Sequence, residues 1–109
     1  MTVAYTTDQM LEELLIRSKG WMAVAFLSRM SIPCDHFTPE FNKLSEALDG
    51  KVRFVRIDVD ENPSITDQLK VVAVPTTLLF DKGDEKARYE GPYSSEALAE
   101  RFSGVMKKG

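Results

Sequence analysis

The clearest candidate for chemistry is the stretch Ser-Ile-Pro-Cys at residues 31–34, which contains the only cysteine of the chain. A thiol can exchange with a disulfide, but only as an exposed thiolate whose pKa is lowered. The hydroxyl of Ser31 is scarcely ionised near neutral pH, and it needs an adjacent base and an oxyanion hole to act as a nucleophile. The only histidine, His36, lies more than one helical turn beyond Ser31, so we expect it to point away. The sequence therefore disfavours a Ser–His hydrolase.

Ser31 and Cys34 also have structural roles open to them. Serine is a favoured helix N-cap, and a helix is predicted to begin directly after Ser31. In its first turn the helix dipole favours the thiolate of Cys34, whereas burial and the charge of Asp35 disfavour it. We expect Ser31 to cap the helix and Cys34 to be a small core residue. Asp35 and His36 are interpreted as part of a solvated helix face.

The elements that position this stretch alternate along the chain. Residues 21–27 (WMAVAFL) are continuously apolar and too few for a helix with a buried stripe, so they predict a central strand covered on both faces. A helix beginning at Pro33 follows, with Phe37, Phe41, Leu44 and Leu48 on one side. The other predicted elements, in chain order, are a strand at 3–5, a helix from Thr6 or Thr7 to Gly20 with Met10, Leu11, Leu14 and Leu15 inward, a strand at 51–60, a helix at 62–70, strands at 75–80 and 85–91 around a turn, and a helix at 94–106 with Leu98, Phe102 and Val105 inward.

This order predicts a parallel unit joined to an antiparallel hairpin in one mixed sheet, with helices on both faces. In open sheets of this kind, ligands bind beyond the carboxyl ends of the parallel strands. The segment that follows Leu27 is one such end. Ser31 and Cys34 are therefore predicted to lie where this architecture places chemistry.

The composition limits which classes of partner and which cellular locations are expected for the chain. The 109 residues fit a single domain spanning residues 1–109, and the net charge of −3 with scattered Lys and Arg disfavours nucleic acid. No apolar stretch approaches the roughly 20 residues of a transmembrane helix, and the N-terminus lacks a signal-peptide pattern. We expect a cytoplasmic protein that binds no membrane. Since there is one cysteine, no His/Cys cluster and no glycine-rich phosphate loop, we predict no intrachain disulfide, no metal and no cofactor.

Several stretches, in order, resemble the thioredoxin family over nearly the whole chain. The strand end AFLSRM precedes Ser-Ile-Pro-Cys, which stands where the family carries Cys-Gly-Pro-Cys, and Pro39 lies five residues after Cys34 as in thioredoxins. VDENP (59–63) is similar to a strand-end stretch of the family. VVAVPTTLLFDKGD resembles the stretch with the family's cis-proline, here Pro75, and YEGPYS has Gly91 at the glycine of the third substrate loop. The resemblance implies a thioredoxin fold, a central mixed β-sheet with helices on both faces, and an ancestry in thiol-disulfide oxidoreduction.

The departures from the family pattern fall at its catalytic positions. The resemblance implies that Ser31 replaces the attacking cysteine and that Cys34 matches the resolving cysteine. The other replacements are Met30 for the tryptophan before the motif, Ile32 for the glycine within it, Ala25 for the buried acid beneath the site and Arg56 for the lysine often paired with that acid.

The resemblance also implies a surface that binds protein. In thioredoxins the cis-proline borders the substrate groove, and the residue before it, here Val74, offers backbone groups with which an extended peptide can pair as an added strand. The substrate-binding residues implied are Met30, Ile32, Val74, Pro75, Gly91 and Pro92, with Met30, Ile32, Val74 and Pro92 forming an apolar floor and Tyr93 at its edge. The partner would be a protein or peptide, a Cys-containing segment being one candidate, and we expect a monomer.

Three hypotheses remain open from the sequence. The first is a binding module that recognises an extended segment of a partner and lacks dithiol catalysis. The second is a monothiol redox protein in which Cys34 forms mixed disulfides with a partner or with glutathione. The third is a working protein-disulfide reductase whose first cysteine was deliberately changed to Ser31, which the gene sequence at codon 31 would decide.

Overall fold

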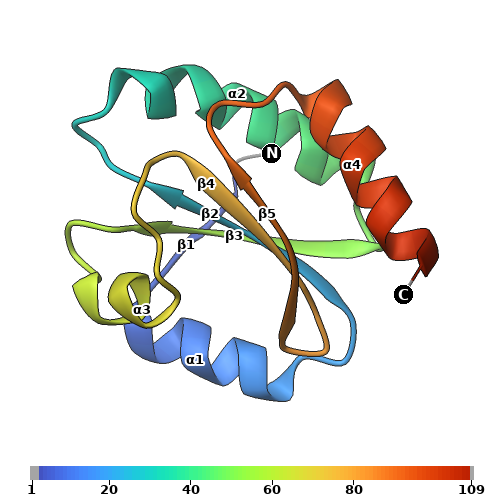
Figure 1. Ribbon diagram of the computed structural model, residues 1–109, viewed down its shortest axis with the longest axis horizontal. Helices are drawn as coiled ribbons and strands as arrows, with labels where there is room; N and C mark the ends of the chain where they lie inside the picture. Colours follow the sequence, from blue (N-terminus) through green and yellow to red (C-terminus); the bar gives the residue numbers. More distant parts are fainter. Residues whose placement is uncertain (1–2, 109) are drawn as a thin grey trace.

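The computed structural model describes residues 3–108 and contains one sheet with helices on both sides (Figure 1). Its elements, in chain order, are β1 (Tyr5–Thr6), α1 (Asp8–Arg17), β2 (Trp21–Leu27), α2 (Ile32–Ala47), β3 (Val52–Asp58), α3 (Pro63–Gln68), β4 (Thr76–Asp81), β5 (Asp84–Glu90) and α4 (Ser95–Lys108). The predicted alternation is therefore present. None of the helices described within residues 3–108 is long and apolar enough to cross a membrane.

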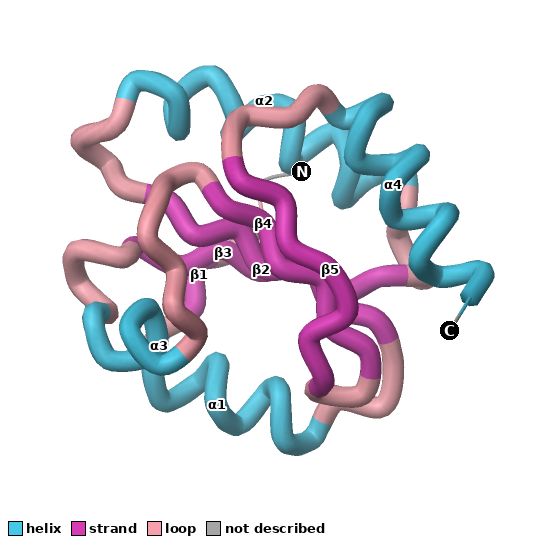
Figure 2. Tube along the Cα trace, in the orientation of Figure 1, coloured by secondary structure: helices cyan, strands magenta, loops and turns pink. Residues whose placement is uncertain are grey.

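The five strands lie in the order β1-β3-β2-β4-β5. β1, β3 and β2 are parallel, whereas β4 runs antiparallel to β2 and β5 antiparallel to β4. Helices α2 and α4 cover one face of the sheet, and α1 and α3 cover the other (Figures 1 and 2). The mixed sheet expected from the sequence is thus confirmed, with β2 in its centre.

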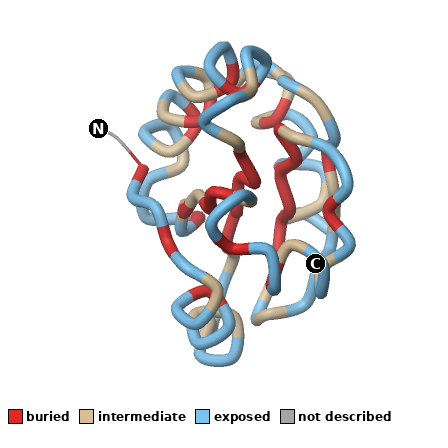
Figure 3. The backbone as a smooth tube through the Cα atoms, turned by 90° about the vertical axis from the view of Figure 1, so that its left-hand side faces the viewer, coloured by how far each residue is buried: buried red, intermediate tan, exposed pale blue. Residues whose placement is uncertain are grey.

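The central strand β2 separates two apolar cores. Ala23, Ala25 and Leu27 belong to the cluster under α2 and α4, while Met22 and Val24, which alternate with them, belong to the cluster under α1 and α3. Buried residues follow the strands through the interior in Figure 3. Each large apolar side chain that is fully buried stabilises the fold by about 1.5–3 kcal/mol. The continuous apolar run of residues 21–27 is explained by this burial on both faces.

The first strand and helix differ from the prediction in detail. β1 starts two residues later than expected, at Tyr5. Helix α1 is capped by Thr7, whose hydroxyl accepts a hydrogen bond from the backbone N–H of Met10, so Thr7 rather than Thr6 is the cap. Met10 is 58% exposed whereas Leu11 is fully buried, so the prediction that Met10 points inward was wrong. The buried apolar stripe of α1 is narrower than the spacing of its apolar residues predicts. Met10 therefore lies on the solvent side of the helix.

Helices α1 and α3 are fastened to each other by reciprocal capping. The backbone N–H of Asp8 donates to Oδ1 of Asn62 at 3.0 Å, and the N–H of Ile65 donates to Oδ1 of Asp8 at 3.0 Å. These contacts satisfy backbone donors at both helix starts. They fix where α1 begins relative to the loop after β3, which is one side of the candidate site.

Candidate functional site

Ser31 lies at the start of α2, just beyond the carboxyl end of β2. Its backbone is extended (φ −108°, ψ 120°), and its Oγ accepts a hydrogen bond from the backbone N–H of Cys34 at 3.3 Å. This is N-cap geometry, so the predicted capping role is confirmed. The hydroxyl oxygen is thus engaged by the helix itself, while the residue remains partly exposed.

Cys34 is held inside the molecule. It is 2% exposed, belongs to the apolar core under α2 and α4, and is a free thiol. Its Sγ accepts a hydrogen bond from the backbone N–H of Ser28 at 3.4 Å. The expectation that Cys34 is a shielded core residue is confirmed. A partner protein cannot reach this sulfur without a movement of the loop at residues 28–31.

The strand register identifies the neighbours of Ala25, the position at which the resemblance implies a lost acid. Ala25 pairs with Arg56 of β3 and with Thr77 of β4, and paired residues point to the same face of a sheet. Arg56 Nε and Thr77 Oγ1 are buried, and neither has a hydrogen-bond partner in the described part of the chain. The interior beneath Cys34 is therefore apolar at Ala25, with one unpaired polar atom on each neighbouring strand.

Three loops meet at this end of the sheet. The register Phe26–Thr76 places the residues before β4 beside the loop after β2, and Val74 packs against the same core as Cys34. The peptide bond between Val74 and Pro75 is cis. The loop after β5 joins them because the N–H of Gly91 donates to the carbonyl of Pro75 at 2.8 Å. Figure 1 shows these loops at the same end of the molecule.

Gly91 is the residue that allows this closure. Its φ of +110° lies in a region that side-chain-bearing residues rarely adopt. The chain can therefore turn directly after β5 and still direct the N–H of Gly91 at Pro75. The glycine predicted as a site residue is thus placed beside Pro75 by a backbone contact.

The surface around these loops is apolar and open. Met30 is 90% exposed and Ile32 is 70% exposed; Pro92 is also exposed, whereas Val74 is half-buried. Met30, Ile32 and Pro92 therefore present apolar side chains to the solvent, and that they form the floor of a peptide groove stays a prediction. Val72, at 86% exposure, adds an apolar side chain that the sequence reasoning missed. Its only signal in the sequence was the valine pair Val71–Val72 before Pro75.

The loop that carries Met30 and Ser31 is anchored by Arg29. Arg29 Nη1 lies 3.3 Å from Oδ2 of Asp58 and 3.2 Å from Oε1 of Glu61, and its guanidinium lies 4.6 Å from the ring centre of Tyr5. The side chain of Asp58 is only 6% exposed, so this ion pair is partly shielded from water.

Ser28 adds a second anchor. Its Oγ donates to Oδ2 of Asp60 at 2.6 Å and accepts the N–H of Met30 at 3.2 Å, while the N–H of Asp60 donates to Oδ1 of Asp58 at 2.9 Å. The sequence reasoning missed this network because no local pattern links residues about 30 positions apart. It holds the Ser31 loop against the end of β3.

The loop before Pro75 has its own anchor in Arg88 of β5. Arg88 donates from Nη2 to the carbonyl of Leu69 at 2.6 Å and from Nη1 to the carbonyl of Lys70 at 2.9 Å. Glu85 accepts from the same guanidinium, and this hydrogen bond is the main cause of a raised pKa at Arg88. These contacts fix the end of α3, from which the segment with Val72 and Val74 departs.

The described residues offer little for metal chemistry. Within residues 3–108 no group of three or more His, Cys, Asp and Glu side chains could hold a metal ion. The chemistry available at the site is therefore that of one buried thiol, one capping hydroxyl and an exposed apolar surface bordered by backbone groups.

The chain is similar to thioredoxins along most of its length. A family model described as Thioredoxin matches residues 2–103. Chloroplastic thioredoxin Y1 of Arabidopsis thaliana is 33% identical over 96 residues, which cover 88% of this chain and 56% of that protein. A thioredoxin of Rickettsia bellii is 31% identical over 94 residues, covering 86% of this chain and 90% of its own.

A solved structure agrees with the sequence matches. The crystal structure of chloroplastic thioredoxin z superposes with a TM-score of 0.88 at 27% sequence identity, covering 98% of this chain and 96% of that chain. This likeness confirms the predicted thioredoxin fold.

Proposed function

Because this chain belongs to the thioredoxin family, we propose that it binds extended segments of protein partners and performs little or no dithiol redox catalysis. The observation that carries this proposal is Ser31, whose hydroxyl caps α2 at the position of the family's attacking cysteine. Thioredoxins act on protein substrates, so a protein partner is consistent with the family. The binding surface and the loss of catalysis are what the proposal adds.

The number of thiols needed for disulfide exchange supports the proposal that the chain does not reduce disulfides catalytically. If the thiolate of Cys34 attacked a partner disulfide, one S–S bond would break and one would form, leaving a mixed disulfide at Cys34 and releasing one partner thiolate. A second thiol is needed to release Cys34, and the chain has only one cysteine. Unless a small thiol from solution released Cys34 from the mixed disulfide, the reaction would stop after one event. The 2% exposure of Cys34 makes even that event slow, so it also weighs against a monothiol enzyme.

The backbone at Val74 supports strand-like binding. Within residues 3–108 the N–H and C=O of Val74 have no hydrogen-bond partner in the protein. An extended peptide could supply both partners, as in other cases where a peptide adds a strand to a sheet edge. The exposed apolar side chains of Met30, Ile32 and Val72 lie on the loops at this end of the sheet and would contact the peptide's side chains.

A matched pair of variants tests this surface. The probe is a reduced, alkylated and permanently unfolded model protein carrying a fluorophore, with binding followed by anisotropy. Val74→Asp should weaken binding at least about tenfold, because a charge would be desolvated under the peptide. Ile16→Asp, at an 84% exposed apolar residue of α1, should leave it unchanged. Equal affinities for the unchanged chain and Val74→Asp, with unchanged circular dichroism, would remove this surface from the account.

Other points remain predictions. The cytoplasmic location and the monomeric state expected from the sequence are proposals here, and the relatives include both chloroplastic and bacterial thioredoxins. Codon 31 of the encoding gene decides whether Ser31 is natural. A cysteine codon there would return the natural protein to the class of dithiol reductases.

A further inference from the structure

Met30 is the most exposed sulfur-containing residue in the described part of the chain. The N–H of Ser31 donates to the carbonyl of Ser28 at 3.2 Å, so residues 28–31 form a β-turn with Arg29 and Met30 at its corner. The N–H of Met30 donates to Oγ of Ser28, also at 3.2 Å. These bonds fix the backbone of the turn, while Met30 remains 90% exposed. Its thioether is therefore open to solutes on an anchored loop.

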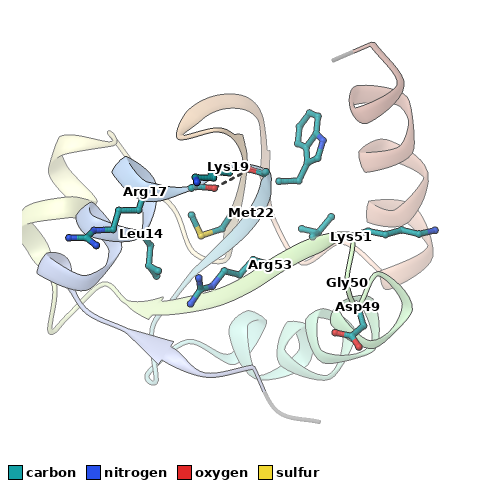
Figure 4. A pocket seen from close by; sticks show the side chains of 12 residues that line it. Leu14, Arg17, Lys19, Met22, Asp49, Gly50, Lys51 and Arg53 are labelled. Carbon is teal, nitrogen blue, oxygen red and sulfur yellow. Dashed lines mark hydrogen bonds between the residues drawn. The ribbon is translucent and has the colours of Figure 1, made fainter.

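Other sulfur atoms of the described chain are shielded from solutes. Cys34, the single thiol, is 2% exposed. Met22 is 1% exposed near the amino end of β2, where Figure 4 shows its sulfur among the side chains that line a depression. Met30 thus carries the accessible sulfur at the end of the sheet where Ser31 lies.

We propose that Met30 is a modification site whose oxidation to methionine sulfoxide weakens peptide binding at the surface around Ser31. This inference rests on the peptide binding proposed above. With hydrogen peroxide as the oxidant, the O–O bond breaks, one oxygen atom becomes bonded to the sulfur and the other leaves as water. The sulfur loses two electrons to the peroxide, and no bond of the protein is broken.

The oxidation changes the apolar character on which peptide binding depends. Thioethers adapt to irregular apolar partners, which suits a surface that binds varied segments. Met30 and Ile32, at 90% and 70% exposure, lie on either side of Ser31 in the chain. A peptide that covered the sulfoxide would remove its oxygen from water, which costs free energy unless a new donor replaces the water. Oxidation of Met30 therefore lowers the affinity for an apolar segment.

The chain cannot reverse this oxidation by itself. Reduction of a sulfoxide to a thioether takes two electrons, which a pair of thiols supplies by forming a disulfide. The chain has one cysteine, and Cys34 is buried. The lowered affinity therefore persists after the peroxide is gone, until a methionine sulfoxide reductase acts.

The test compares each chain with itself before and after treatment with hydrogen peroxide. Catalase removes the excess peroxide, and binding of the fluorescent unfolded model protein is measured by anisotropy. Mass spectrometry of peptides gives the oxidised fraction of all five methionines. The affinity should fall about fivefold as Met30 becomes sulfoxide, with an unchanged melting temperature because this side chain is exposed. Methionine sulfoxide reductases for both epimers, with dithiothreitol, should restore it.

Three variants assign the effect to one sulfur atom. Met30→Leu keeps an apolar side chain without sulfur, so its affinity should be the same before and after peroxide. Met30→Gln carries a polar side chain of similar length and should bind about fivefold more weakly than the unchanged chain without any peroxide. Met10→Leu is the matched control at a 58% exposed residue of α1, and it should respond to peroxide as the unchanged chain does.

Three results would overturn the inference while leaving peptide binding intact. The first is an equal affinity of the untreated chain and of the chain with Met30 fully converted to sulfoxide. The second is a loss of affinity in peroxide-treated Met30→Leu as large as in the unchanged chain. The third is a Met30 that stays unoxidised while Met10 is converted. If the untreated chain does not bind the model protein at all, the proposed function fails and this inference fails with it.

Discussion

The two ends of β2 differ in how their side chains are held. At the carboxyl end, exposed Met30 and Ile32 stand on a loop tied down by Arg29 and Ser28, whose partners lie beyond β3. At the amino end, Lys19 and Arg53 have no partners among the described residues. One end presents exposed apolar side chains on an anchored backbone, and the other presents cationic side chains that have no ion-pair partner among the described residues.

This difference separates two kinds of recognition. An anchored loop loses little conformational entropy when a partner docks, which favours the peptide binding that we propose. Cations without ion-pair partners attract anions through long-range electrostatics but do not by themselves hold an anion in one orientation. Changes at one end should therefore leave the other end undisturbed, and the Asp58→Ala variant below tests that independence.

The largest effect is expected from Asp58→Ala. This change removes the acceptor of the part-buried Asp60 N–H and one of the two ion-pair partners of Arg29, and a buried donor left without a partner costs about 1–3 kcal/mol. The free energy of unfolding should fall by that amount in chemical denaturation, and amide exchange at Met30 should accelerate. Asp58→Asn keeps an acceptor oxygen and should lose less. A changed environment of Trp21 in the folded state would show that the two ends are coupled.

A smaller effect is expected from Ser31→Ala. The cap bond to the Cys34 N–H is lost, and removing such a cap typically costs about 1 kcal/mol. Thermal denaturation should show a lower melting temperature. The control is Ser64→Ala in α3, whose exposed side chain forms no hydrogen bond among the described residues. An equal melting temperature for Ser31→Ala and the unchanged chain would show that Ser31 does not stabilise α2.

The smallest effect concerns pH and the contact between α2 and α4. The Glu40 carboxylate accepts the N–H of Ser95 at 2.8 Å, and this hydrogen bond is the main cause of its lowered pKa. Since the folded pKa lies below the unfolded value, the stabilisation is complete above the unfolded pKa and is lost as pH falls through the folded one. Stability should fall less steeply between about pH 5 and 3 in Glu40→Gln. Identical slopes in urea titrations would exclude this contribution.

The sequence predicted those features that follow from local patterns. The run at residues 21–27 predicted a strand buried on both faces, and Ser31 at the start of an apolar stripe predicted a cap; both are confirmed. The prediction that Met10 points inward was wrong, because the spacing of apolar residues shows which side of a helix is buried but not how wide the buried stripe is.

Features that depend on distant residues could not be predicted from those patterns. Arg29 meets Asp58 and Glu61 only because β2 and β3 run parallel and end together. Arg17 and Arg53 line one depression only because α1 leads into β2 beside the start of β3. Charged side chains on different elements carry no periodic signal, so their meeting is visible only in the folded chain.

The central claim is that Ser31 prevents dithiol turnover, and its most direct test compares the unchanged chain with Ser31→Cys. Turbidity is recorded as a disulfide-linked two-chain substrate is reduced, with dithiothreitol as the recycling reductant. The unchanged chain should add nothing to the background rate, whereas Ser31→Cys should turn over. Its rate should stay below that of a typical thioredoxin, because Ala25 offers no carboxylate and positioned proton transfer is worth about 10²–10⁴ in rate. Sustained turnover by the unchanged chain would contradict the claim, as would an inactive Ser31→Cys variant in which the disulfide between positions 31 and 34 forms.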